Sequence, residues 1–344
     1  MAVNFFSQNL RILVGAVESS PGTMETLTAS DFDVRIREPS PTYNPEYDND
    51  SSKWANGNHG EDSAIPGVTS VSVSFNVRAV WGGAVGTAPG WWKFANGCGL
   101  TDDAWAAAGR GLHPRKSYDV KPMTLWIYDI QLGATPAAVC HKIKGAMGNM
   151  TMGADGAGKP VMCNFEFTGV FAGYEDVANG DIPAAFGIDT TCADRMLMSQ
   201  AFVGSTSQLI TSWMLDLGND IQPLYDQTED HGIAYYHIAA RNPRMSMNPL
   251  MRTVATDNIL DELVGGATGC PTTASLMVGD TGIDSKFAVI VPKAQLIEAG
   301  MESREGKDAW TQNWRCLGNG VTGAVSDGDL EEEDTFEILQ GSRS

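Results

Sequence analysis

The chain has 344 residues, with 23 Lys+Arg against 42 Asp+Glu and a formal net charge of −19. This length fits about two ordinary domains, and the 42% hydrophobic content argues against wholesale disorder. The acidic excess argues against a basic surface of the kind that binds the phosphate backbone of nucleic acids. No apolar run reaches the ~18 residues of a membrane span. The first residues lack the pattern of a secretory signal, so we expect a protein that stays in a cytosol.

Strand patterns dominate the first part of the chain. After an arm-like lead-in, Val17–Ser30, apolar and polar residues alternate over Asp31–Arg37 and again over Val71–Arg78. A period of two predicts strands with one buried and one solvated face. Between them, Glu38–Gly67 is rich in Pro, Asn, Asp, Ser and Gly, and we predict a long loop. A loop of that length indicates a functional or partner-bound segment.

Helical patterns are few. PGWWKFANGCG, which begins at Pro89, is a short candidate, and DNILDELVGG predicts a helix capped by Asp257 and ended by Gly265. The remaining strand patterns share the period of two, and they cover 125–128, 165–167, 213–217, 235–238 and 287–291. Near the end, Gly320–Gly341 holds an acidic run followed by the strand-like TFEIL.

These patterns predict a mainly β protein with two antiparallel β-sandwich domains, each with a flanking helix and long loops. We place the first domain at residues 1–185, with the N-terminal arm and the loop 38–67. The second domain covers residues 186–344 and ends in the acidic segment.

The sequences of the two predicted domains are weakly similar, and we call this similarity the echo. A strand followed by Pro and Tyr, a strand followed by a loop and helix, and two strand-like runs around a Gly-Lys turn recur in the same order. The matched segments are 31–47 with 210–227, 68–100 with 232–266, and 142–167 with 292–317. The echo predicts a duplicated domain, and chance similarity between two β-rich segments is the alternative.

No sequence motif indicates a catalytic site. GADGAGK (Gly153–Lys159) has Pro160 where a phosphate-binding loop needs Ser or Thr, and a strand pattern follows it, so we predict a hairpin turn. The six cysteines form no C-x-x-C pair, and the five histidines have no ligand spacing. We predict buried free thiols, with Cys163 and Cys316 at matching places in the echo. We therefore predict no catalytic residues, no cofactor and no metal, although a glycosidase pair could hide among the carboxylates.

The opening of the chain nevertheless resembles a known family. Tail tube (major tail) proteins of long-tailed bacteriophages begin with a lead-in of the form G.E…GT…LTA.D, and the chain has GAVESSPGTMETLTASDFD. Their next block joins a strand to a G…G.AP.W…L..CG loop and helix, to which VWGGAVGTAPGWWKFANGCGL is similar. The resemblance covers about residues 10–170, and the second half resembles a further tube domain more loosely.

The resemblance implies a structural virion protein, assembled in the host cytoplasm and located in the tail. Tube subunits stack as rings around a lumen, where DNA and the tape-measure protein pass without specific binding, and tail terminator or tip proteins meet the tube ends. No membrane partner is implied. The resemblance also implies that long loops contact neighbouring subunits, and in the loop 38–67 the candidate residues are Tyr43, Tyr47, Trp54, Glu61 and Asp62.

Two ring compositions follow from the resemblance. A fused pair of tube domains implies rings of three chains with pseudo-sixfold symmetry. A single tube domain with an outer decoration domain implies rings of six chains. The sequence also leaves open another virion or injection-device tube component and a carbohydrate-active β-sandwich protein.

Overall fold

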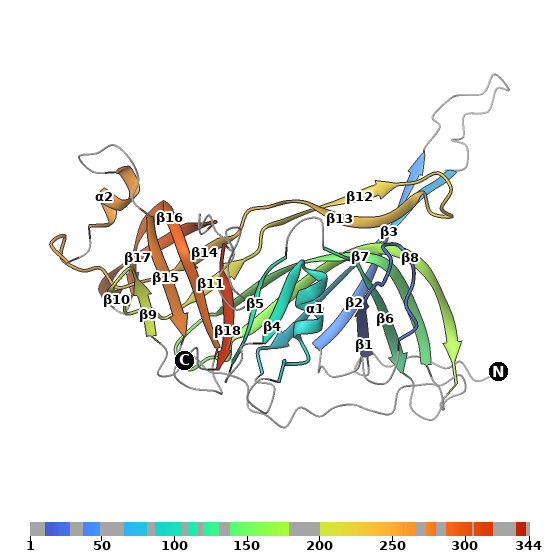
Figure 1. Ribbon diagram of the computed structural model, residues 1–344, viewed down its shortest axis with the longest axis horizontal. Helices are drawn as coiled ribbons and strands as arrows, with labels where there is room; N and C mark the ends of the chain where they lie inside the picture. The colour runs from blue at the N-terminus through green and yellow to red at the C-terminus, as the bar shows by residue number, and fades with distance from the viewer. Residues whose placement is uncertain are drawn as a thin grey trace, which may run out of the picture.

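The computed structural model confirms the predicted mainly β class, and Figure 1 shows its arrangement. It describes residues 11–27, 37–48, 65–80, 87–104, 109–115, 120–130, 138–178, 200–256, 258–265, 273–279, 287–304, 306–318 and 335–341. None of the helices in these ranges has the length and apolar character that a membrane crossing requires.

The first half of the chain forms an antiparallel set of strands in the order β1-β6-β7-β8-β3-β2, which we call the first unit. The hairpin β4–β5 lies between α1 and β6 in the chain. The elements are β1 Arg11–Val17, β2 Arg37–Asp48, β3 Ile65–Arg78, α1 Trp92–Gly97, β4 Leu100–Ala104, β5 Gly109–Pro114, β6 Met123–Ile130, β7 Ala138–Ala154 and β8 Met162–Val177.

The second half repeats this order. Its strands run β9-β15-β16-β17-β14-β11, which we call the second unit, and β10 pairs with β9. The elements are β9 Gln200–Val203, β10 Thr206–Ser207, β11 Trp213–Asp216, β12 Asn219–Tyr225, β13 Ile233–Arg241, β14 Arg244–Met247, α2 Ile259–Val264, β15 Thr273–Gly279, β16 Phe287–Arg304, β17 Lys307–Leu317 and β18 Glu337–Gly341.

The correspondence extends to the register of the central hairpins. In both β7–β8 and β16–β17, seven residue pairs separate a bulge from the hairpin end. These pairs run from Met147–Thr168 to Gly153–Met162, and from Glu298–Asn313 to Arg304–Lys307. The echo segments 142–167 and 292–317 occupy the equivalent hairpins β7–β8 and β16–β17, whereas 210–227 and 232–266 also contain β12 and β13, which form a separate two-stranded sheet.

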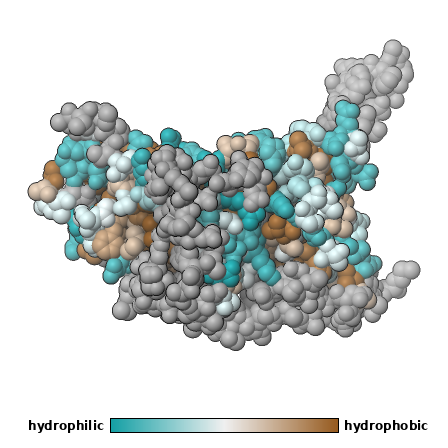
Figure 2. Space-filling view, in the orientation of Figure 1, coloured by the Kyte–Doolittle hydropathy of each residue, from teal (hydrophilic) through white to brown (hydrophobic). Residues whose placement is uncertain are grey.

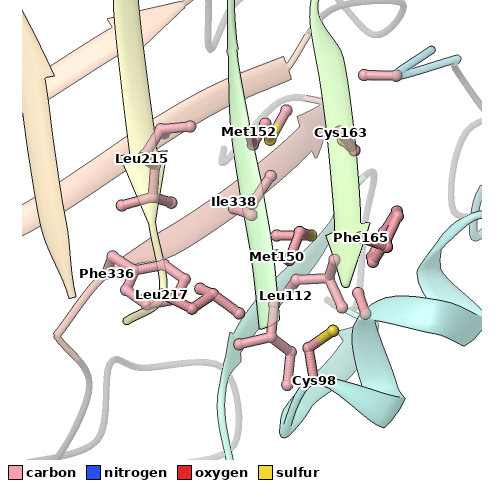
Figure 3. Packing of buried hydrophobic residues seen from close by; sticks show 14 of the residues in the cluster. Cys98, Leu112, Met150, Met152, Cys163, Phe165, Leu215, Leu217, Phe336 and Ile338 are labelled. Atoms are coloured by element: carbon pink, nitrogen blue, oxygen red, sulfur yellow. The ribbon is translucent and has the colours of Figure 1, made fainter. Parts of the chain in front are cut away.

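The two units join in one sheet. β11 pairs with β7, and β18 pairs with both β16 and β5. One hydrophobic cluster contains side chains from both halves of the chain, and Figure 3 shows Leu215 and Leu217 lying beside Met150 and Met152. The predicted boundary at residue 185 lies outside the described residues, and the division into two domains stays a prediction.

The predicted strand faces agree with burial where they are described. Val71, Val73, Phe75 and Val77 are buried in β3, while the residues between them are partly or fully exposed. The alternation predicted over Asp31–Arg37 lies mostly outside the described residues. The GADGAGK segment is the predicted turn, because the Lys159 N–H donates to the Gly156 carbonyl between β7 and β8.

Two predictions of irregular structure were wrong in part. Much of the predicted loop Glu38–Gly67 is strand, since β2 extends to Asp48 and β3 begins at Ile65. Three prolines misled the prediction, although proline is compatible with an edge strand. The predicted arm begins inside β1 at Val17, and residues 18–27 are hydrogen-bonded to the fold rather than extended as an arm.

The second helix begins one residue later than predicted. Asn258 caps α2 by accepting from the Asp261 N–H, and Asp257 lies outside the described residues. Gly265 ends the helix at φ 80°, a conformation that glycine adopts without strain. TFEIL leads into β18, whereas residues 319–334 with the acidic run lie outside the described residues.

Candidate functional site

The place where the two units join is built like a protein interior. Four residues of β11 add antiparallel to the end of β7, with Trp213 opposite Ala154 and Asp216 opposite Thr151. We call this pairing the junction. A Cβ on Gly153 would lie 2.3 Å from the Trp213 carbonyl oxygen, so the close approach requires glycine.

Apolar side chains fill the junction from both units. Met150 is 1% exposed, and Met152, Leu215 and Leu217 are fully buried. The Leu217 N–H donates to the Met150 carbonyl at 3.1 Å, which extends the hydrogen bonding beyond β11. Figure 3 shows Phe336 and Ile338 next to these residues, so the C-terminal strand covers the same interior.

Beyond the junction, β12 and β13 form a two-stranded ribbon that runs from the second unit across the first (Figure 1). Ile233 and Tyr236 of the ribbon pack against Met147 and Val170 of β7 and β8. Gly145 has φ +59°, and its Cβ would lie 2.8 Å from the Tyr235 Cα, so the bulge in β7 brings the two backbones together.

Polar contacts fix the base of the ribbon to the first unit. The Arg241 guanidinium donates to the Asn219 side-chain oxygen at 2.9 Å and to the Gly99 carbonyl at 2.9 Å. The Asn219 amide donates to the carbonyls of Cys98 and Gly148. Burial lowers the pKa of Arg241 to about 10, which leaves it charged at neutral pH.

Two strand edges in the sheet have no described neighbour, and six strands separate them in the sheet order. β2 is the last strand in the order, and within the described ranges it pairs with β3 alone. β16 pairs with β15 as far as Gln295, and past that residue no described strand pairs with this side of β16. Such edges are templates for the addition of another strand.

The β16 edge carries an exposed apolar side chain. Met301 is 69% exposed, and Glu302 and Ser303 beside it are exposed as well. Figure 2 shows hydrophobic and hydrophilic residues interspersed over the second-half strands. The unpaired backbone groups of this edge are the feature that can bind another chain.

Two of the predicted contact residues lie in strand β2 and not in a loop. The Tyr43 hydroxyl is hydrogen-bonded to His141 Nδ1, and its ring meets the Phe171 ring edge-on at 5.5 Å. His141 Nε2 lies 3.4 Å from Asp129, which favours the tautomer that donates there and accepts from Tyr43. Burial, together with the Asp129 charge, raises the pKa of Tyr43. Tyr43 is 39% exposed and therefore remains accessible.

The structure describes less of the other predicted contact residues. Tyr47 belongs to β2 and pairs with Pro66, and its side chain is not described. Trp54, Glu61 and Asp62 lie outside the described residues. The sequence reasoning did not select Met301 or β11, although the echo, once aligned on its hairpin ends, places Met301 opposite Met150.

A buried carboxylate holds the N-terminal lead-in on the first unit. Glu18 is 1% exposed and accepts hydrogen bonds from the Gly22 N–H, the Gly145 N–H and the Thr124 hydroxyl. Burial raises the pKa of Glu18 despite these donors. The same carboxylate therefore orders the lead-in and the β7 bulge on which the ribbon rests.

The described cysteines are core residues, as predicted. Cys98, Cys140, Cys163 and Cys316 are buried free thiols, and Cys192 and Cys270 lie outside the described residues. Burial raises the pKa of Cys140 and of Cys316 to about 12, which keeps both as thiols at neutral pH. Cys163 and Cys316 do not occupy matching places, because Cys163 lies one pair from its hairpin end while Cys316 lies beyond the bulge.

Within the described ranges, no group of three or more His, Cys, Asp or Glu side chains is placed to hold a metal ion. No family model matches the chain, and no curated protein matches its sequence. The geometry of the junction and of the two edges is therefore the basis for a functional assignment.

Proposed function

We propose that the chain is a self-assembling structural subunit of a bacteriophage tail tube, in which stacked rings surround a lumen that conducts DNA during ejection. The observation that carries the proposal is the repeated strand order, in which the second unit adds strand β11 to the first. The family resemblance of the opening supplies the biological setting.

The two edges support head-to-tail assembly. The edge at β2 and the unpaired end of β16 are separated by six strands of one sheet, so copies can join by strand addition. Contacts between two different surfaces close into a ring when the rotation per copy allows it. With two equivalent units per chain, three chains provide six units, and the trimeric ring is our leading composition. A ring of six chains with an outer decoration domain is the alternative.

The remaining features of the proposal come from the resemblance. The partners are further copies, the tape-measure protein and the tail terminator or tip proteins, while DNA passes through the lumen without specific binding. The net charge of −19 fits a wall that does not retain DNA. The location is the virion tail, with assembly in the host cytoplasm.

Electron microscopy of the purified protein tests the proposal. We expect stacked rings with a central channel and six lobes per ring. A protein that stays monomeric over a wide range of concentration, salt and pH would contradict it. Rings without stacking, or a sheath-like shape, would favour another virion or injection-device component.

The competing proposal is a carbohydrate-active protein, because such proteins use β-sandwiches and the chain is rich in carboxylates. Glycan hydrolysis that is lost in a paired-carboxylate variant would establish it. We expect no turnover above that of a heat-denatured control.

A further inference from the structure

The matched registers identify which residues of the β16 edge correspond to the junction. Because Gly153 and Arg304 both form the last pair before their hairpin turns, Met150 corresponds to Met301 and Thr151 to Glu302. The cross-strand partners also agree in type, since Met150 lies opposite Phe165 and Met301 opposite Trp310.

Burial separates the two positions. Met150 is 1% exposed within the junction, whereas Met301 is 69% exposed near the end of β16. The difference follows from the neighbouring strand, because β11 lies beside the end of β7 and no described strand lies beside the end of β16.

The same comparison identifies the strand that is missing at β16. Val73 pairs with Phe167 and Pro41, while Met247 pairs with the equivalent residue Gln312 and with Trp213. In the first unit, β2 therefore holds the place of β11. Pro41 corresponds to Trp213, and the next three residues, Thr42–Asn44, correspond to Met214–Asp216.

We propose that β2 of one copy pairs antiparallel with the β16 edge of the next copy, as β11 pairs with β7 within the chain. Thr42 then lies opposite Arg304, Tyr43 opposite Ser303, and Asn44 opposite Glu302. This inference names the contact for the assembly under Proposed function and rests on it. Six strands separate β16 from β2 in the sheet order, so the two edges of one chain do not pair with each other and the partner is a second copy.

The chemistry of β2 suits a short contact. Proline has no N–H, and in an edge strand its nitrogen faces the free side. With Pro41 and Pro45 on that side, the β2 edge offers the Tyr43 N–H and a row of carbonyls. Such an edge resists long unspecific pairing but accepts a contact of about four residues, which is the length of β11 in the junction.

Disulfide trapping tests the register directly. In Asn44→Cys/Glu302→Cys the two cysteines face each other across the contact, at the ~4.5–5.5 Å Cα separation of paired strands, which permits a disulfide. We expect dimers and closed trimers on a non-reducing gel after mild oxidation, and only heterodimers when the two single variants are mixed.

The matched control is Asn44→Cys/Glu298→Cys. Glu298 is exposed on the same strand, four residues from the proposed partner, which places it about 13 Å away. Crosslinking at least ~10-fold faster for the matched pair than for the control supports the pairing. Equal rates, or no crosslinking of the matched pair, overturn it. The single variants account for the native cysteines.

A second test measures assembly. Met301→Asp should weaken ring formation at least ~10-fold in light scattering, because Met301 corresponds to the buried Met150 and burial of a carboxylate at that position is unfavourable. Val264→Asp is the control, since Val264 is 63% exposed on α2. An equal effect of both substitutions contradicts the inference. Rings without matched crosslinks refute this contact and leave the tube proposal standing, whereas matched crosslinks in open chains without rings refute the tube and keep the contact.

Discussion

The ends of β7 and β16 are equivalent in register and differ in their surroundings. The β7 end, Met150–Gly153, is largely apolar and lies beside β11, a strand of the same chain. The β16 end, Met301–Arg304, carries Glu, Ser and Arg and has no described strand beside it. A contact that is always present can be apolar, whereas an edge that waits for a partner needs charge to avoid aggregation. Under the proposed assembly, one structural unit would serve both as a permanent joint within the chain and as a contact between copies.

Truncation of the two methionines should give the largest difference. Met150→Ala opens a cavity in the buried junction and should cost about 2–5 kcal/mol of unfolding free energy. Met301→Ala removes an exposed side chain and should change stability by less than about 0.5 kcal/mol. Urea denaturation of the monomeric protein measures both. Similar losses for the two substitutions would show that the ends are not in different environments.

Loss of the Arg241 contacts at the base of the ribbon should have an intermediate effect on stability. Arg241→Met keeps the apolar stem but leaves the Asn219 oxygen and the Gly99 carbonyl without this donor, at a cost of about 1–3 kcal/mol. Hydrogen exchange should then accelerate in β12 and β13 more than in β16 and β17. The exposed Arg244 provides a control, Arg244→Met. Uniform acceleration throughout the sheet would mean that Arg241 does not act on the ribbon.

The smallest effect on stability should be a pH dependence that arises from Glu18, the residue that holds the N-terminal lead-in on the first unit. Because burial raises the pKa of Glu18, its protonated form is favoured in the folded state. Its contribution to stability is therefore full below the ordinary glutamate pKa of 4.5 and falls as pH rises through the folded-state pKa.

Glu18→Gln should remove this contribution, so the urea midpoint should fall less between pH 4.5 and 8 than in the parent protein. The partly exposed Glu25, whose pKa is lowered by hydrogen bonds from Ser19, is the control, and Glu25→Gln should not flatten the profile. A steeper decline in Glu18→Gln would reverse the assigned sign.

Local patterns in the sequence predicted local structure well. The alternation over Val71–Arg78 gave both the strand and its buried face, and Gly265 gave the end of α2. The echo also predicted the correspondence of the hairpins β7–β8 and β16–β17. The first two of these signals depend on residues close together in the chain.

Non-local features left little signal. β2 escaped prediction because its prolines suit an edge strand as well as a loop. The junction involves four residues of β11 whose partner lies about 60 positions earlier in the chain, and an alternating pattern predicts a strand without naming its neighbour. Exposure of Met301 follows from the absence of a described neighbour beside β16, which the residue types do not encode.

The central claim is that each chain supplies two equivalent units to a ring. Native mass spectrometry of rings released from assembled tubes tests it most directly, because the mass of a closed ring counts its chains. The account predicts three times the chain mass of 36.8 kDa, with six lobes in the corresponding image. Rings of six chains would contradict it and would make the second unit an outer decoration.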